Sequence, residues 1–252
     1  MSGIGTGYDY SSTTYSPEGR IYQIEYAHKA VEHSGTGVGL QVKDGVVVGV
    51  EKILVSKLLE PGSNTRLFGV DEHTGFAICG ALPDGRQIVS RAREEAKAHR
   101  DVYGVSMPTR LLAERIASFK HVYTLYSAVR PFGVSSLVAG YDEKGPQLFI
   151  VEPNGVLTGY YGYAIGQGQQ HAKSSIEKLD LKSMTCRQAI VEIAKILHEA
   201  HTEHRDKPFE IELGWICDES DRQFTRVPEE LRAEADAIGR QALEESDSDD
   251  DD

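Results

Sequence analysis

Short β-type runs and amphipathic helical segments alternate in blocks along this chain, and their order constrains its fold more than any other feature. An Asp-Gly pair separates the runs at 37–42 and 46–50, which is a hairpin pattern. Helical periodicity follows over 84–103 and 108–126. Strand runs at 134–141, 147–151 and 156–161 come next, followed by a helix pair, a strand, and a final helix that ends at about residue 243. This order predicts an α+β fold, a four-layer αββα sandwich with two mainly antiparallel sheets between helix layers.

We find no linker composition inside residues 1–243 and expect them to form a single domain. Residues 1–19 are rich in Gly, Ser, Thr and Tyr and show no periodicity, so they need another surface to order them. A helix is predicted at 20–33, with one apolar face that it cannot bury alone. Residues 244–252 are predicted to be a disordered acidic tail.

Charge and cysteine content exclude several classes of protein. Seven acidic residues in the last nine account for much of the net charge of −12, and −5 remains elsewhere. No basic footprint supports a nucleic acid as the main ligand, and no apolar stretch reaches the ~20 residues of a membrane span. The three cysteines, Cys79, Cys186 and Cys217, include no Cys-x-x-Cys spacing, which argues against a disulfide framework and favours a reducing compartment. Without a leader segment, we expect a cytoplasmic and nuclear protein.

Familiar site motifs are incomplete in this sequence. The run from His198 to His204 resembles a zinc-binding helix, but its second histidine, His201, comes one residue too early. We therefore predict a solvated polar face near a helix end, with no metal and no cofactor. The glycine-rich stretches at 35–39 and 166–168 complete no phosphate-binding motif and predict tight backbone packing, although an anion site at the second stays open.

A longer motif resembles the N-terminal signature of proteasome α subunits. It consists of Tyr8-Asp9, then Tyr15-Ser16-Pro17-Glu18-Gly19-Arg20-Ile21-Tyr22-Gln23-Ile24-Glu25-Tyr26-Ala27, then Ala30-Val31. Further matches lie at 45–52, 123–133, 159–160 and 164–166, and residues 5–9, 130–133 and the acidic end resemble one eukaryotic subtype.

The resemblance implies the αββα fold of the N-terminal-nucleophile hydrolases and a structural subunit of the outer α ring of the 20S proteasome core. Such a subunit scaffolds the β rings and contributes to the axial gate and regulator docking in ubiquitin- and ATP-dependent protein degradation. Its partners would be other α subunits in a seven-membered ring, β-ring subunits, and a regulatory cap and activators, with no membrane and no nucleic acid as main ligand.

The same resemblance implies that the chain is catalytically silent. Catalytic β subunits carry an N-terminal threonine whose free amine serves as the base, with a lysine and an aspartate nearby. Counted from the 45–52 match, the nucleophile position falls at about Gly35, the aspartate position holds Glu51, and the lysine position holds Arg66. Thr36 is adjacent, but its nitrogen is a peptide N–H. Two alternatives stay open: an enzyme created by cleavage before Thr36, and a free-standing interaction module that uses the acidic tail.

The resemblance also assigns a gate cluster to Tyr8, Asp9, Pro17 and Tyr26. In the family, the aromatic ring packs on the proline and the hydroxyl pairs with the carboxylate across neighbouring subunits, which holds the tails in the open-gate arrangement. Helix 20–33 would lie on the outer face of the ring. The alternative is that the four residues serve only as turn and packing residues.

Three further residues are candidates for contacts or modification. Arg66 matches the lysine that receives the terminal carboxylate of an activator, and otherwise it is a surface or interface arginine. Ser246 and Ser248 have acidic residues three positions on, which is the pattern preferred by kinases of the casein-kinase-2 type.

Overall fold

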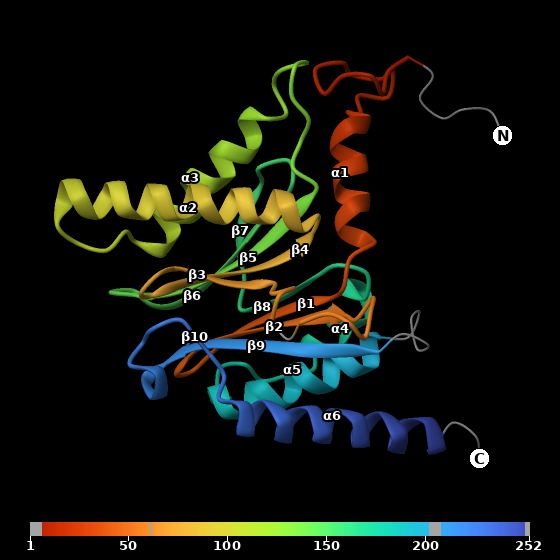
Figure 1. The fold of residues 1–252 in the computed structure, drawn as a ribbon, viewed down its shortest axis with the longest axis vertical. Coiled ribbons are helices and arrows are strands. Elements are labelled where there is room, and N and C mark those ends of the chain that lie inside the picture. Colours follow the sequence, from red (N-terminus) through yellow and green to blue (C-terminus); the bar gives the residue numbers. More distant parts are fainter. Residues whose placement is uncertain (1–6, 61, 202–207, 250–252) are drawn as a thin grey trace.

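Two antiparallel sheets stack face to face in the computed structural model, which describes residues 7–60, 62–201 and 208–249 (Figure 1). The first sheet has the strand order β10 (Thr225–Arg226), β9 (Phe209–Cys217), β2 (Gly45–Ile53), β1 (Gly37–Val42) and β8 (Gly162–Ile165). The second has the order β3 (Leu67–Asp71), β4 (Thr74–Gly80), β5 (Val134–Asp142), β6 (Gly145–Val151) and β7 (Leu157–Gly159).

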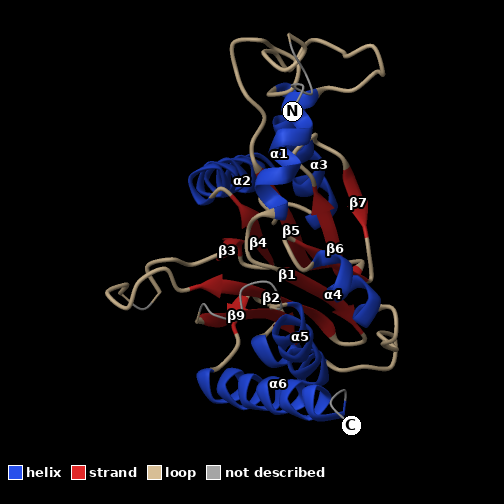
Figure 2. Ribbon diagram, turned by 90° about the vertical axis from the view of Figure 1, so that its right-hand side faces the viewer, coloured by secondary structure: helices blue, strands red, loops and turns tan. Residues whose placement is uncertain are grey.

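Helices cover the outer faces of both sheets (Figures 1 and 2). The second sheet is covered by α2 (Leu82–Tyr103) and α3 (Thr109–Val122). The first sheet is covered by α4 (Gln169–Ile176) and α5 (Cys186–Ala200), with α6 (Glu229–Asp249) packed on α5. A single turn, η1 (Asp218–Ser220), follows β9, and α1 (Tyr22–Glu32) stands beside the layers against β4 and β5. The predicted four-layer αββα sandwich is therefore confirmed.

Strand β2 shows how the sequence builds these layers. Val46, Val48 and Val50 lie in the core between the two sheets, whereas Val47 belongs to the core under α5. Because side chains alternate between the faces of a strand, both faces of β2 are buried and its sequence is an almost continuous valine run. Gly49 faces α5, and a Cβ there would collide with the side chain of Ile193.

Two boundaries differ from the predicted ones. The strand expected at 156–161 ends at Gly159, and a further strand begins at Gly162 in the other sheet. Gly162 is needed at this crossing, because a Cβ there would lie 2.6 Å from Cγ2 of Ile176. Helix α6 continues to Asp249 rather than ending near residue 243, since no Gly or Pro interrupts it there. No helix in the described residues is long and apolar enough to cross a membrane.

Lys120 of α3 is fully buried, which the helical pattern did not predict. Its Nζ donates to the carbonyl oxygens of Val134 (3.0 Å) and Val151 (2.9 Å) and to Oγ of Ser136 (3.3 Å). The side chain thus joins α3 to β5 and β6. Burial lowers the pKa of Lys120 to about 7, and the charge of Glu152 opposes this only in part.

We expect this lysine to make stability depend on pH. Between the folded pKa of about 7 and the ordinary value of about 10.4, the unfolded chain binds more protons, so the free energy of unfolding rises with pH in this window. Urea unfolding of the full chain at pH 7 and pH 9 should show about 2 kcal/mol more stabilisation in the wild type than in Lys120→Met. Lys97→Met, which removes an exposed lysine of α2, is the control and should behave like the wild type. Equal pH dependence in all three chains would contradict the assignment.

Candidate functional site

The position counted as the nucleophile has no room for a side chain. Gly35 immediately precedes Thr36 and β1, and a Cβ on Gly35 would lie 2.5 Å from the carbonyl oxygen of Glu51. A real Cβ does not approach a backbone oxygen this closely, so a threonine at this position would force the backbone apart. Glycine is therefore required by the close approach of the two segments.

Thr36 is fully buried, and its backbone N–H, its hydroxyl and its carbonyl oxygen, which accepts the Glu51 N–H at 2.8 Å, are all used within the chain. Its backbone N–H donates to Oε2 of Glu51 at 2.9 Å, and its Oγ1 accepts the N–H of Gly168 at 3.1 Å. The N–H of Gln167 donates to the carbonyl oxygen of Ser34. Because these two amides of the 166–168 stretch bind the chain itself, the expectation of tight packing there is favoured over an anion site.

The other carboxylate oxygen of Glu51 contacts Nδ1 of His201 at the end of α5. Both side chains are buried, and the His201 ring lies 4.2 Å from the ring of Phe209, centroid to centroid. Nε2 of His198, also buried, lies 2.8 Å from Oδ1 of Asp236 in α6.

The expectation of a solvated histidine face is therefore wrong for His198 and His201. Helix α6 packs over α5 and brings Asp236 to His198, a partner that the local sequence pattern could not reveal. His204 lies outside the described residues. Within 7–60, 62–201 and 208–249 no cluster of three His, Cys, Asp or Glu residues could hold a metal ion.

Arg66 lies just before β3 and is half-buried. Its Nη1 donates to the carbonyl oxygen of Gly80 at the end of β4 (2.8 Å), and its backbone N–H donates to Oε2 of Glu212 (2.7 Å). Arg66 and Glu51 both act electrostatically on Cys79, so the three counted positions are brought into one region. Burial raises the pKa of Cys79 to about 12. The positive charge of Arg66 acts in the opposite direction, but its effect on this pKa is smaller. Such a thiol is no nucleophile at neutral pH.

The N-terminal segment is held against α1 and against the loop that follows α3. The Tyr26 hydroxyl donates to Oδ2 of Asp9 at 3.4 Å, and the Gln23 side-chain amide donates to the Asp9 backbone oxygen. Ser12 is buried and its hydroxyl donates to the carbonyl oxygen of Tyr126 at 3.2 Å. Partial burial and then Asp9 raise the pKa of Tyr26, so the phenol stays protonated and can donate. Figure 1 shows this segment above the N-terminus of α1.

Of the four predicted gate residues, the structure thus brings Asp9 and Tyr26 together within one chain. Tyr8 and Pro17 are both exposed. Ser246 and Ser248 lie within α6, and their side chains are outside the described residues.

An ion pair that the sequence analysis missed fixes the loop under the N-terminal segment. Nη1 and Nη2 of Arg130 bind the two carboxylate oxygens of Asp84 at 2.6 and 2.8 Å, and the N–H of Gly133 adds a third bond at 3.0 Å. The hydrogen bonds from Arg130 lower the pKa of Asp84 most, and the hydrogen bond from Gly133 lowers it less strongly. Burial acts in the opposite direction. Asp84 lies in the first turn of α2, so the pair anchors the loop to the helix. The only sequence signal was the Arg-Pro-Phe-Gly match at 130–133.

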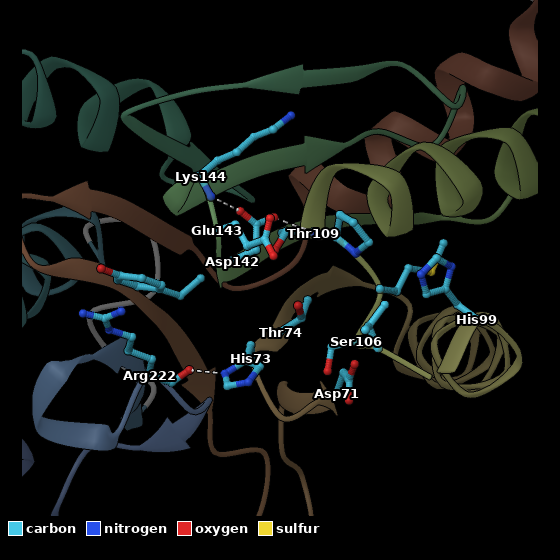
Figure 3. Close-up of a pocket in the computed structure, with 14 residues that line it drawn as sticks. Asp71, His73, Thr74, His99, Ser106, Thr109, Asp142, Glu143, Lys144 and Arg222 are labelled. Atoms are coloured by element: carbon cyan, nitrogen blue, oxygen red, sulfur yellow. Dashed lines mark hydrogen bonds between the residues drawn. The ribbon is translucent and has the colours of Figure 1, made fainter. Parts of the chain in front are cut away.

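A cavity of about 610 Å³ lies elsewhere, between the β3–β4 turn, the α2–α3 loop and the β5–β6 turn (Figure 3). Three of its charged side chains are already partnered: Asp71 with Arg100, Asp142 with the backbone N–H groups of Thr109 and Lys144, and Arg222 with Asp218. His73 contacts the carbonyl oxygen of Arg222 at 2.7 Å. We therefore assign no reaction to this cavity.

Comparison with known proteins decides the family. The family model for proteasome subunits matches residues 31–216, and the model for the N-terminal signature of A-type proteasome subunits matches residues 8–30. The chain belongs to the proteasome α-subunit family. It is similar over 249 residues to the alpha type-3 proteasome subunits of Spinacia oleracea (54% identity) and of Arabidopsis thaliana (52%), with 99% of this chain and 100% of each relative covered. The Dictyostelium discoideum alpha type-3 protein is 50% identical over 246 residues, 98% of this chain and 99% of its own length. These relatives carry the name of the subtype that residues 5–9, 130–133 and the acidic end resemble.

We expect Glu51 to be a major stabilising residue of this α subunit. Replacing it in Glu51→Ala removes the acceptor of the buried Thr36 N–H and one partner of His201, and should lower the free energy of unfolding by about 3 kcal/mol. Glu51→Gln keeps an acceptor oxygen and should cost less. Urea unfolding measures both, with Glu94→Ala as the control because Glu94 is exposed on α2. If Glu51→Ala costs no more than Glu94→Ala, the role assigned to Glu51 is wrong.

Proposed function

We propose that this chain is a non-catalytic, structural subunit of the outer α ring of the 20S proteasome core, and that it scaffolds the β rings in ubiquitin- and ATP-dependent protein degradation. One observation carries the silent character: the Thr36 nitrogen is a peptide N–H that donates to Glu51. A threonine nucleophile of this kind needs a free amine that accepts a proton. An arginine, Arg66, at the lysine position cannot supply that base.

A covalent probe tests the silent character directly. A peptide epoxyketone reacts with both the amine and the hydroxyl of an N-terminal threonine, so in the assembled particle it should label catalytic β subunits, which serve as the internal control. We expect no label on this chain, and we expect its mass to include the residues before Thr36. A labelled Thr36, or a chain that begins at Thr36, would establish the enzymatic alternative.

We propose further that residues 1–19 contribute to the axial gate through Tyr8, Asp9, Pro17 and Tyr26, and that α1 contacts neighbouring α subunits in a seven-membered ring. The Asp9–Tyr26 contact and the anchor at Ser12 support this, because they fix the direction in which the chain leaves α1. The exposure of Tyr8 leaves its ring available to a neighbouring protomer.

The gate proposal predicts a selective effect of Tyr26→Phe. This change removes the hydroxyl that donates to Asp9, a bond worth about 1 kcal/mol, and should lower cap-stimulated hydrolysis of a short fluorogenic peptide by up to about fivefold. Probe labelling of the β subunits, carried to completion, should reach the same extent in both variants. Tyr10 is 88% exposed and Tyr10→Phe is the matched control. Identical stimulation of the two variants would argue against the cluster.

Regulator docking and modification are proposed at the remaining candidate residues. Arg66 would receive the terminal carboxylate of an activator. Its hydrogen bond to Gly80 supports this because the bond holds the guanidinium in place. Loss of activator binding in Arg66→Ala is the test.

Phosphorylation of Ser246 or Ser248 would add negative charge to α6, and an intact mass that phosphatase does not change would exclude it. We propose a cytoplasmic and nuclear location, to be tested by cell fractionation.

A further inference from the structure

Cys186 and Cys217 are far apart in the sequence but adjacent in the fold. Cys186 is the first residue of α5 and Cys217 is the last residue of β9, and their thiols are hydrogen-bonded to each other. Gly45, the strand partner of Cys217, makes room for them. A Cβ on Gly45 would lie 2.8 Å from Sγ of Cys186 and 2.9 Å from Cβ of Cys217. Cys79, by contrast, lies in the core between the two sheets.

The surroundings of the two sulfur atoms are unequal. Sγ of Cys217 accepts the S–H of Cys186 and the backbone N–H groups of Glu219 and Ser220. These donors, with the Ser220 hydroxyl as a fourth, stabilise the thiolate of Cys217 and lower its pKa to about 7 against the effect of burial. The same hydrogen bond, with burial, raises the pKa of Cys186. Of the two thiols, Cys217 is therefore the one that loses its proton first.

The residues next to this pair in the sequence lie at the surface of the molecule. Both cysteines are 1% exposed, but Arg187 and Glu219, the residues that follow each of them closely, form a two-bonded ion pair (2.7 Å each) whose side chains are 61% and 43% exposed. The turn after β9 is short, and Asp221 and Arg222 there adopt positive φ values of 53° and 57°. Opening of such a turn exposes Cys217 without unfolding a strand.

We propose that Cys186 and Cys217 are a redox modification site, at which a mild oxidant such as hydrogen peroxide converts the two thiols into a reversible disulfide. The Cys217 thiolate attacks one peroxide oxygen, the O–O bond breaks, and hydroxide leaves and takes up a proton, which gives a sulfenic acid and water. The Cys186 sulfur then attacks the Cys217 sulfur and loses its proton, and the S–O bond breaks to release a second water. Two glutathione molecules reduce the disulfide: the first attacks one sulfur, breaks the S–S bond and forms a mixed disulfide, and the second displaces the cysteine and leaves as glutathione disulfide, so both cysteine thiols are restored.

This disulfide would link the N-terminus of α5 to the end of β9 beside the β1–β2 turn. It would therefore tie the outer helix layer to the first sheet. The site is independent of the gate residues and of the region around Thr36, so it goes beyond the proposed function and does not rest on it.

Peptide mapping of the full chain and of the assembled particle tests the proposal. After hydrogen peroxide at pH 7, free thiols are blocked with N-ethylmaleimide in denaturant and the protein is cut with trypsin without reductant. We expect residues 183–187 joined to residues 206–222, two hydrogens lighter than the sum of the two peptides. Glutathione should release the two peptides, and Cys79, in peptide 67–86, should be found alkylated.

Single substitutions separate reactivity from mere proximity. Cys79→Ser should keep the cross-link, whereas Cys186→Ser and Cys217→Ser should both lose it. In Cys186→Ser, dimedone should trap a sulfenic acid at Cys217; in Cys217→Ser, Cys186 should stay unlabelled. The proposal is overturned if oxidation leaves Cys186 and Cys217 fully alkylated, if the cross-link involves Cys79 instead, or if dimedone labels Cys186 and not Cys217.

Discussion

The centre of the molecule depends on the buried hydrogen bond between the Thr36 amide and the Glu51 carboxylate. It ties the segment before β1 to β2, and through His201 it reaches the end of α5, so the first sheet and its helix layer meet there. A buried carboxylate is tolerated only when hydrogen-bonded partners compensate for its lost hydration. The arrangement holds a hydrogen-bonded peptide amide at Thr36, next to the counted nucleophile position at Gly35, and this contact is the structural basis of the silent subunit that we propose.

The N-terminal segment and the exposed face of α1 are the surfaces on which the gate proposal rests. The Asp84–Arg130 pair fixes the loop on which Ser12 rests, and the Asp9–Tyr26 contact ties the same segment to α1. These interactions are local to one chain. They prepare a segment of defined direction, which a ring of such subunits can use at its axis.

Local signals in the sequence predicted the layers well, because turn residues such as Asp44-Gly45 and the change from strand to helix periodicity are local properties. The crossing from β7 to β8 was missed because the aromatic pair Tyr160-Tyr161 favours a continuous strand, although Gly159 and Gly162 flank it. The buried states of Lys120 and His198 depend on partners from other elements, such as Asp236, and no local pattern contains them. The counted positions of Gly35, Glu51 and Arg66 do share one region, but only the structure shows that backbone contacts fill it.

The mass of the endogenous chain in each fraction of a sedimented gentle lysate tests the central claim most directly. A silent scaffold subunit predicts the chain in particles of proteasome size, with the residues before Thr36 still attached. A chain found mainly free or in small oligomers would contradict the ring assignment and favour an independent interaction module. A chain that sediments with the particle but begins at Thr36 would have a free amine in place of the peptide N–H that donates to Glu51. This result would contradict the proposal that the subunit is catalytically silent.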